Sequence, residues 1–314
     1  MTIGNFDGVH IGHAALIRAC RGAAGERGRV VVMAFDPHPA TTLAPDRVPA
    51  RLTTFETRTA LLKSLGADEV VRLEPSRELL ALTPEQFVDR VLMPLGPAVV
   101  VEGDDFHFGR GRAGTTSVLA KLGDDRGFRV HVEPAVEVDL DDQTIVRASS
   151  SLIRWLISQG RVSDARRLLN RPYAVTGEVV QGDQRGRDIG YPTANILTPV
   201  LLPGDGVYAG TVQSAFGRFD AAINVGRRPT FRGLERRMEV FAMSEAGQPA
   251  ALPMKYGWHA EVSVEHWIRE DLRFSSVQDL IDQIGRDVRE SCRRLTRGRT
   301  PGRVPSPAYP RHSA

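Results

Sequence analysis

Short apolar runs alternate with amphipathic stretches along the first half of the chain. Four runs have the length and composition of buried strands, namely 30–35, 69–73, 98–102 and 128–132. Between them, helical spacing of apolar positions marks 55–65 and 83–92, and the second stretch opens with Thr83 as a cap, Pro84 in the first turn and Gln86 to complete a capping box. This alternation predicts a parallel sheet with helices on both faces, whose ligands bind beyond the carboxyl ends of the strands.

The pattern changes after residue 154. Two helical stretches, 152–159 and 163–170, precede short strands that are separated by Gly and Pro turns. These strands are predicted at 173–180, 207–213, 219–225, 238–242 and 259–268. Their spacing of roughly ten residues favours a small antiparallel barrel. A final helix, with Ser275 as its cap and Gln278 three residues later, is predicted to run to about Arg294.

The sequence therefore predicts an α/β protein with two domains. A parallel-sheet domain is expected over 1–170, and a small antiparallel β-barrel with a C-terminal helix over 171–296. At 314 residues the chain is long enough for each domain to bury a core of its own. Residues 297–314 are dominated by Gly, Pro, Ser and Arg, a composition that predicts a disordered tail.

Composition and charge indicate the compartment of the protein and limit its partners. Cys20 and Cys292 lie far apart in sequence and no signal peptide precedes the first motif, which predicts a reducing cytoplasm. No apolar run reaches the length of a membrane span, so no membrane partner is expected. The net charge is +3, but residues 293–314 hold six arginines and no acidic residue, which leaves −3 on the rest. No specific nucleic-acid partner is expected either, and the oligomeric state stays open.

The segment 4–13, which reads G-N-F-D-G-V-H-I-G-H, is the most informative motif. Its glycines let the backbone approach an anion, and His10 and His13 lie one helical step apart around Gly12. A helix that begins near Gly12 directs its free N–H groups and positive dipole end at the same ligand. The motif therefore predicts a site for the phosphates of a nucleotide. The alternatives are two ordinary surface histidines or half of a metal site, but for a metal no Cys, Asp or Glu follows at a suitable spacing.

Further motifs follow at the ends of predicted strands and at helix starts. In the first half they are F-D-P-H-P at 35–39, G-D-D-F-H-F-G at 103–109 and S-S-S-L-I-R at 149–154. In the second half they are G-D-Q-R-G-R-D-I-G-Y-P-T-A-N at 182–195, G-V-Y-A at 206–209 and N-V-G-R-R-P-T-F at 224–231. With these motifs in this order, the chain resembles the prokaryotic bifunctional riboflavin kinase/FAD synthetase family over residues 1 to about 290.

The resemblance implies a Rossmann-like N-terminal domain of the H-x-G-H nucleotidyltransferase type, which adenylylates FMN. ATP would be bound there by Gly4, Asn5, Phe6, Asp7, Gly8, His10, Gly12, His13, Ser149, Ser150 and Arg154. His10 and His13 would act catalytically as phosphate donors, and Arg154 would offer a planar fork to the departing phosphates. His38 and Asp105 would contact the flavin substrate. A simple Asx turn at Asn5 and Asp7, and a purely structural role for His38, are the alternatives.

The second half would hold a kinase site of an unusual kind. It has no G-x-x-x-x-G-K-[ST] run, which excludes a Walker-type phosphate loop. A flexible basic loop and the motif after it would bind ATP, through Gly182, Arg185, Gly186, Arg187, Gly190, Thr193 and Asn195. Thr193 and Asn195 offer oxygens that suit Mg²⁺. By resemblance, Glu239 would be the catalytic base for the ribityl 5′-hydroxyl. The alternatives are a turn in which Asn195 satisfies the backbone, and an ordinary exposed glutamate at 239.

Several positions depart from the usual pattern of the family. Leu152 stands where an arginine is usual, which removes one cation from the adenylyltransfer site. His107 likewise replaces a usual Arg or similar residue, and Phe241 replaces a usual His. The loop 242–255 is longer and less acidic than its counterpart. Because the first motif begins almost at Met1, the strand before it is expected to be a stub, unless the start is misassigned.

The sequence thus predicts an enzyme with two activities that both use MgATP. The C-terminal module would convert riboflavin and ATP to FMN and ADP, and the N-terminal module would convert FMN and ATP to FAD and pyrophosphate. Riboflavin, FMN, FAD and ATP are then the partners, and the flavins are substrates and products rather than prosthetic groups. Retention of one activity, or a non-catalytic regulatory protein that binds flavin or nucleotide, are the alternatives. The general base argues against the second, because a pure binding protein has no use for one.

Overall fold

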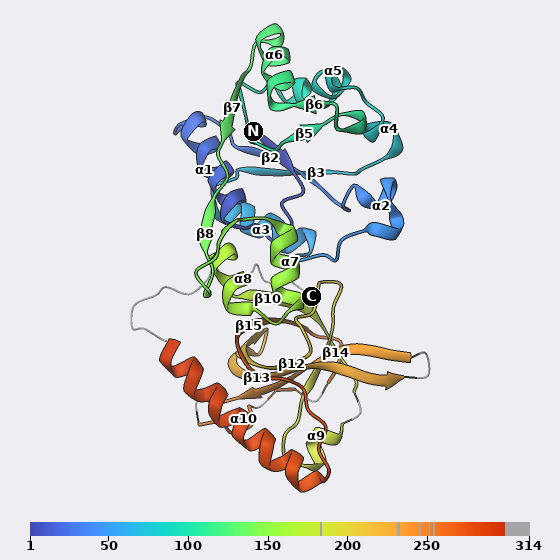
Figure 1. Ribbon diagram of the computed structural model, residues 1–314, viewed down its shortest axis with the longest axis vertical. Coiled ribbons are helices and arrows are strands. Elements are labelled where there is room, and N and C mark those ends of the chain that lie inside the picture. The colour runs from blue at the N-terminus through green and yellow to red at the C-terminus, as the bar shows by residue number, and fades with distance from the viewer. Residues whose placement is uncertain (183, 231–232, 245, 251, 254, 299–314) are drawn as a thin grey trace. The chain divides into compact units, whose positions relative to one another are not determined.

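The computed structural model describes residues 1–182, 184–230, 233–244, 246–250, 252–253 and 255–298, with the backbone alone at 185, 228–230, 233–235 and 297–298. The chain divides into two compact units (Figure 1). Unit 1 comprises Met1–Arg154 and Arg167–Asn170, and unit 2 comprises Trp155–Arg166 and the chain from Arg171 onward. The domain boundary at residue 170 stays a prediction, because the helical region before it contributes to both units.

Unit 1 is built on parallel strands. One group is β1 (Thr2–Gly4), β2 (Val31–Phe35) and β3 (Glu69–Leu73), and the other is β4 (Val99–Gly103) and β7 (Arg129–Glu133). Met1 joins the two groups, because its carbonyl accepts from the Val101 N–H at 2.9 Å and its amino group donates to the Val99 carbonyl at 2.8 Å. The strand order is therefore β3-β2-β1-β4-β7, and it reverses between β1 and β4. Such a switch point is where open α/β sheets bind ligands.

Each face of this sheet has its own apolar core. Successive residues of a strand point to opposite faces. Val100 accordingly packs with Leu119 on one face, whereas Val101 packs with Ile17 and Leu62 on the other. These partners lie on α6 (Thr116–Arg126), α1 (Ile11–Ala24) and α3 (Phe55–Ser64). The predicted parallel sheet with helices on both faces is confirmed.

Several short elements of unit 1 differ from the prediction. The stretch 83–92 begins as α5 (Pro84–Phe87), with the expected capping box of Thr83 and Gln86, and continues as a π-helical turn over Val88–Leu92. The remaining short elements were not predicted. They are the hairpins of β5 (His107–Phe108) with β6 (Gly114–Thr115) and β8 (Glu137–Asp139) with β9 (Ile145–Arg147), the helices α2 (Ala40–Leu43) and α4 (Arg77–Leu80), and 3₁₀ turns at Pro45–Arg47, Met93–Leu95 and Arg110–Arg112. Strands of two or three residues are too short to show alternation.

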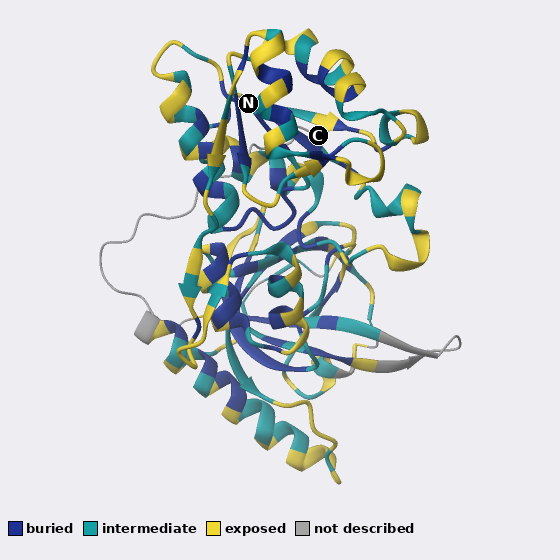
Figure 2. Ribbon diagram, turned by 45° about the horizontal axis from the view of Figure 1, so that its top comes forward, coloured by how far each residue is buried: buried dark blue, intermediate teal, exposed yellow. Residues whose placement is uncertain are grey.

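Unit 2 contains a closed antiparallel barrel, in the order β10-β11-β14-β13-β12-β15. Its strands are β10 (Tyr173–Val180), β11 (Ala194–Leu197), β12 (Gly206–Ser214), β13 (Gly217–Thr230), β14 (Gly233–Met243) and β15 (His259–Arg269). Valines such as Val175, Val225 and Val240 are fully buried in it, and Figure 2 shows long buried stretches along these strands. The predicted barrel is confirmed. The strand β11 was missed, because it begins within the P-T-A-N motif, which is typical of a loop.

The helices α7 (Ser150–Ser158) and α8 (Val162–Leu169) precede the barrel, α9 (Arg185–Asp188) lies in the loop before β11, and α10 (Val277–Gly298) ends the described chain. The predicted cap of α10 is wrong by one residue. Ser276 caps the helix, because its hydroxyl accepts from the Asp279 N–H at 3.1 Å. Ser275 instead donates to the Asp279 carboxylate at 3.0 Å, and Gln278 donates to Asp282 further along.

The apolar side of α10 packs on the barrel. Val288 and Leu295 form a core with Phe241 and Met243 of β14. The helix backbone continues past the predicted end at Arg294, and the predicted disordered tail, apart from the backbone of its first two residues, lies outside the described residues. Within the part of the chain that is described, no helix combines the length and the apolar character that crossing a membrane requires.

Candidate active sites

The first motif forms a strained loop between β1 and α1. Phe6 and Val9 have left-handed backbones, with φ of 49° and 42°. A β-branched residue such as Val9 rarely adopts this conformation, which costs about 1–3 kcal/mol. Both side chains are buried, and the Val9 N–H donates to the Phe6 carbonyl at 3.1 Å. Packing therefore holds the loop in a shape that the free peptide would not keep.

His10 and His13 cap the start of α1 and stack on each other. The Nδ1 atom of His10 accepts from the N–H groups of Gly12 and His13 at 3.2 and 3.4 Å, and Nδ1 of His13 accepts from the His10 N–H at 3.3 Å. The ring centroids lie 3.6 Å apart. A neutral imidazole whose Nδ1 accepts a hydrogen bond carries its proton on Nε2. The Nε2–H group of each ring is therefore a hydrogen-bond donor. A Cβ atom at Gly12 would lie 3.0 Å from the His10 ring, which explains the glycine between the two histidines.

A cavity of about 220 Å³ lies at the switch point between β1 and β4. The predicted residues in its wall are Gly4, Phe6, His10, Gly12, His13, Asp105, Ser149 and Ser150. Other predicted residues, namely Asn5, Asp7, Gly8, His38 and Arg154, do not line this cavity in the described structure. The structure thus brings the first motif together with the third and fourth, and it places the remaining predicted residues in a neighbouring group around Asp7.

Two serines at the start of α7 complete the cavity wall. The Ser149 hydroxyl oxygen accepts from the Leu152 N–H at 3.2 Å and so caps the helix. The Ser150 hydroxyl donates to the Asp7 carbonyl at 2.8 Å. Leu152 itself, at the position where the family usually has an arginine, is half-buried and does not line the cavity. Position 152 therefore supplies no positive charge to this cavity.

Asp7 holds a buried group of polar contacts. Its carboxylate accepts from the N–H groups of Leu52 and Thr53, each at 3.0 Å. Arg154 donates from Nη2 to Asp7 Oδ2 at 2.6 Å and from Nε to the Ala50 carbonyl at 2.6 Å. Arg154, predicted as a phosphate ligand, is thus engaged by the protein itself. Its contacts fix the chain from residue 50 to 53 against the first motif.

Arg58 on α3 connects the first motif with the F-D-P-H-P motif. Its side chain is 4% exposed, and Nη1 donates to the carbonyls of Asn5 and Phe35 at 2.8 and 2.9 Å. Its Nη2 atom lies 3.6 Å from Asp7 Oδ1 and 3.8 Å from Asp36 Oδ1. Burial lowers the pKa of Arg58, and the two carboxylates oppose that effect. One guanidinium therefore ties together two loops that the sequence assigned to ligands.

His38 is a half-buried ring next to Asn5. Its Nδ1 accepts from the Ala40 N–H at 3.0 Å, and its Nε2 lies 3.4 Å from the Asn5 side-chain amide. Burial, aided by the positive charge of Arg154, lowers the pKa of His38, so the ring is neutral at pH 7 with its proton on Nε2. The Asn5 Oδ1 atom is buried without a partner. Turning the amide so that Oδ1 faces Nε2 satisfies both groups, since the two orientations have the same shape.

The kinase motif in unit 2 depends on close approach of its glycines. A Cβ atom at Gly182 would lie 2.1 Å from Nδ2 of Asn195, so only glycine allows this contact. A Cβ atom at Gly186 would lie 2.3 Å from the Tyr191 carbonyl. The loop that contains α9 therefore folds directly over the start of β11.

Strand register places Asn195 and Glu239 side by side. Asn195 of β11 pairs with Glu239 of β14, and Glu239 also pairs with Asn224 of β13. Paired residues of antiparallel strands project from the same face of a sheet. Met238 and Val240 are fully buried, so Glu239 between them points away from their side of the sheet. The predicted metal ligand and the predicted base thus share one face.

A cavity of about 150 Å³ lies over this region of the barrel. Its wall contains the predicted residues Gly182, Gly186, Arg187, Thr193 and Asn195. Gly190 and Glu239 are not in its wall, and the side chain of Arg185 lies outside the described residues. Sequence reasoning did not assign Lys255, Tyr256 and Trp258, which also line it. Their signal was the run K-Y-G-W at 255–258, a lysine followed by two aromatic residues around a glycine at the end of the unusual loop.

The departure at Phe241 has a structural explanation. Its ring is 4% exposed and lies 5.4 Å from the Tyr191 ring, nearly edge-on. It packs in the core that also contains Val288 and Leu295 of α10. An apolar ring at this position therefore supports the docking of α10 and takes no part in the cavity wall.

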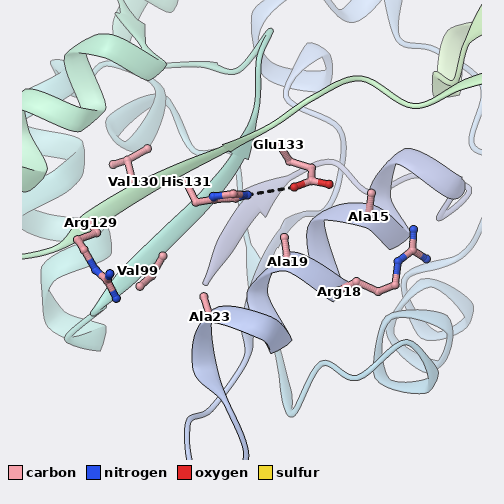
Figure 3. Close-up of a pocket in the computed structure, with 9 residues that line it drawn as sticks. All are labelled: Ala15, Arg18, Ala19, Ala23, Val99, Arg129, Val130, His131 and Glu133. Carbon is pink, nitrogen blue, oxygen red and sulfur yellow. Dashed lines mark hydrogen bonds and ion pairs between the residues drawn. The ribbon is translucent and has the colours of Figure 1, made fainter.

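A larger groove, of about 670 Å³, lies between α1 and β7 in unit 1 (Figure 3). Alanine side chains of α1 form one wall, and His131 and Glu133 of β7 form part of the other, 3.1 Å apart. None of the predicted site residues lines this groove. Size alone therefore does not identify the reactive site in this protein.

The two cavities lined by predicted site residues, one in each unit, lie in two recognisable enzyme domains. The FAD synthetase family model matches residues 1–149, and the riboflavin kinase family model matches residues 169–295. The first match contains every residue of the unit 1 cavity wall except Ser150, and the second contains the whole wall of the unit 2 cavity. The fold and the sites thus define an ATP-dependent flavin enzyme with a nucleotidyltransferase domain and a kinase domain.

Similar proteins span almost the whole chain. The bifunctional riboflavin kinase/FMN adenylyltransferase of Escherichia coli (strain K12) is 36% identical over 295 residues, covering 91% of this chain and 90% of that protein. The enzyme of the same name from Bacillus subtilis (strain 168) is 32% identical over 304 residues, covering 93% and 91%. A crystal structure described as a macrolide-efflux protein from Streptococcus pneumoniae matches with a TM-score of 0.80 and 31% identity, over 95% of this chain and 94% of that one. The chain belongs to the bifunctional riboflavin kinase/FMN adenylyltransferase family.

Proposed function

We propose that this chain carries out both reactions of its family, one at each of the two cavities. The observation that supports this best is the gathering of distant motifs. His10 and His13 meet Ser149 and Ser150 in one cavity, and the 182–195 motif meets Lys255, Tyr256 and Trp258 in the other. Neither grouping follows from nearness in sequence alone.

In unit 1, a phosphate oxygen of FMN attacks the α-phosphorus of ATP. The bond from that phosphorus to the bridging oxygen of pyrophosphate breaks, and pyrophosphate leaves. The protein supplies alignment and charge neutralisation rather than a covalent intermediate. The N–H groups of Gly12 and His13 already donate to His10 Nδ1. The Nε2–H groups of His10 and His13, at the positive end of the α1 dipole, donate to phosphate oxygens. His38, neutral and anchored by Ala40, and Asp105 contact the flavin substrate.

In unit 2, the donor set fits Mg²⁺. Asn195 is 8% exposed, and it lies with Thr193 in a cavity that admits phosphate oxygens and water as the remaining ligands. When bound, Mg²⁺ neutralises charge on the phosphates of ATP. Arg187 and Lys255 add positive charge from the cavity wall. Glu239 takes the proton from the ribityl 5′-hydroxyl as that oxygen attacks the γ-phosphorus, which yields FMN and ADP.

We further propose that the enzyme works in the cytoplasm, with riboflavin, FMN, FAD and ATP as its partners. Cys20 and Cys292 are both free thiols, as is usual in a reducing compartment. Burial raises the pKa of Cys20 to about 11, which keeps this thiol protonated and unreactive at neutral pH. Neither cysteine is part of the two reactions.

A pair of substitutions separates the two sites. His13→Ala should abolish FAD formation from FMN and spare FMN formation from riboflavin, because it removes phosphate donors in unit 1 alone. Thr193→Ala should do the reverse, because it disturbs the Mg²⁺ ligands in unit 2. Chromatographic separation of riboflavin, FMN and FAD after incubation with MgATP measures both activities.

His131→Ala and Thr296→Ala serve as matched controls, since both residues lie outside the two cavities. Equal loss of both activities in folded His13→Ala protein would overturn the assignment of two sites. FMN formation at the wild-type rate by Thr193→Ala would overturn the metal role. A wild-type protein that forms neither product would overturn the proposed function itself.

A further inference from the structure

Glu102 is a buried carboxyl group in the wall of the unit 1 cavity. It lies on β4 and is 1% exposed. Its Oε1 atom accepts from the Ile3 N–H at 2.7 Å, and the Thr2 hydroxyl lies 3.4 Å from the same oxygen. Among the described residues no donor is bonded to Oε2. One carboxyl oxygen is thus used within the protein, and the other is available to a ligand.

Glu102 also takes the place of a main-chain hydrogen bond. Met1 pairs with Val99 and Val101 as in a parallel ladder. Continuation of that ladder would bond the Ile3 N–H to the Val101 carbonyl. The Glu102 side chain accepts this N–H instead, so the ladder ends there and the sheet opens at its switch point. The carboxyl group therefore lies at the place where the cavity enters the sheet.

The surroundings of Glu102 favour its protonated form. Burial raises the pKa of Glu102 well above the usual range of a glutamate, while the Ile3 N–H, the Thr2 hydroxyl and the Met1 ammonium oppose the shift. The other charged or titratable groups around it are Met1 before β1, His10, His13 and Cys20 on α1, Asp105 after β4, Glu133 on β7 and Arg147 on β9. Because Oε1 is an acceptor, the proton resides on Oε2.

We propose that Glu102 is a further ligand-binding residue of the adenylyltransfer site, where its Oε2–H donates a hydrogen bond to the bound nucleotide. This inference rests on the proposed function. ATP offers nitrogen acceptors on its base and oxygen acceptors on its ribose and phosphates, whereas an ionised carboxylate would repel the triphosphate. Affinity for ATP should therefore fall as the pH rises through the pKa of Glu102.

The test measures KM for ATP against pH, with FMN supplied so that only adenylyl transfer is observed. In the wild-type enzyme KM should rise as Glu102 ionises. Glu102→Gln keeps an acceptor for Ile3 and a donor for the ligand but cannot ionise, so it should lose that part of the rise. Glu102→Val lacks the donor, and its KM should be raised roughly three- to tenfold at acid pH, the usual worth of one hydrogen bond.

Glu26→Gln is the control, because Glu26 is exposed and does not line the cavity. It should follow the wild-type profile. All other titratable groups of the cavity are kept in Glu102→Gln and Glu102→Val, so the difference between profiles isolates Glu102. A Glu102→Gln profile that parallels the wild type would overturn the inference. Absence of FAD formation by the wild-type enzyme would instead overturn the proposed function.

A stability measurement keeps the inference testable if a variant loses activity. The folded state holds the Glu102 proton more tightly than the unfolded chain does. Its contribution to stability is therefore complete below the ordinary glutamate pKa and is lost as the pH rises through the raised value. Denaturant unfolding of Glu102→Gln should lack this decline. A decline equal to that of the wild type would show that Glu102 is not protonated in the folded protein, and would overturn the inference.

Discussion

The two cavities are assembled in different ways. In unit 1, loops from distant parts of the chain are held by buried polar contacts, with Arg58 bonded to two carbonyls and close to two carboxylates. In unit 2, the key residues are set by strand register, as Asn195 opposite Glu239 shows. The first site depends on a few side chains that hold backbone in place, whereas the second depends on the barrel itself.

This difference has a consequence for substitutions. A change in the Asp7 and Arg58 contacts alters the positions of several ligand-binding loops at once, because each side chain bonds to main-chain atoms of another loop. A change at Glu239 or Asn195 removes one functional group and leaves the strand pairing intact. Losses at the first site should therefore combine activity with stability, and losses at the second should be confined to catalysis.

The largest expected effect tests the second half of this comparison. Glu239→Gln should lower the turnover of riboflavin phosphorylation by roughly 10² to 10⁴, the usual worth of a positioned general base, with little change in ATP binding or unfolding. Steady-state kinetics with riboflavin and thermal unfolding measure the two quantities. The matched control is Glu137→Gln, at an exposed strand glutamate of unit 1. A loss below tenfold would favour an ordinary strand glutamate at 239.

The next effect tests the first half of the comparison. Arg58→Met should destabilise unit 1 by about 3–5 kcal/mol, because Asp7 and Asp36 lose a buried partner. It should also slow FAD formation by about 10²-fold through misplaced loops, while FMN formation continues. Arg58→Lys should keep part of the stability of unit 1 and part of the rate of FAD formation. The exposed Arg90→Met should keep both at the wild-type level. Denaturant unfolding with parallel assays checks these values. A stable Arg58→Met protein with normal FAD synthesis would remove the distinction between the two sites.

The smallest expected effect tests whether the C-terminal residues take part in either site. Deletion of residues 297–314 should leave both activities unchanged, because no predicted site residue lies there and Leu295, the last residue of the α10 core, is kept. Weak, salt-sensitive binding of polyanions should decrease, since four of the six terminal arginines are removed. Both product assays and a salt titration of polyanion binding measure this. Tight nucleic-acid binding by the shortened protein would reopen a binding role for the rest of the chain.

Periodicity predicted many of the longer segments, although the helix α6, with eleven residues, was not predicted. Strands such as β2 and β3, with five residues each, show apolar runs that identify them, and the predicted bounds agree within one residue. The strand β11 could not be found in this way, because its four residues, A-N-I-L, are too few to show an alternation. The cap of α10 was misplaced because Ser275 and Ser276 are equivalent in sequence, and only the hydrogen bond to Asp279 distinguishes them.

Site residues could be predicted from the sequence where the local backbone structure requires a particular residue type. The spacing of His10, Gly12 and His13 was enough to place both rings at a helix start. Arg58 and Glu102 were missed, since one charged residue within a helix or strand follows no spacing rule. Their signal was position: Arg58 lies on the side of its helix that carries Leu62, and Glu102 is the residue before the last of a buried strand. Their hydrogen-bond and ion-pair partners are distant in sequence and come close only when the chain folds.

The closure of the barrel also determines the order of events during synthesis. β10 pairs with β15, so that Tyr173 meets Val264, about 90 residues later in the chain. At roughly 5–20 residues per second, the ribosome needs about 5–20 s to produce that partner. Until then β10 has an unpaired edge, and the barrel on which Asn195 and Glu239 depend is incomplete. The sheet of unit 1 needs only residues made earlier, so its domain is ready first, and the kinase becomes active only once the last strand has been made.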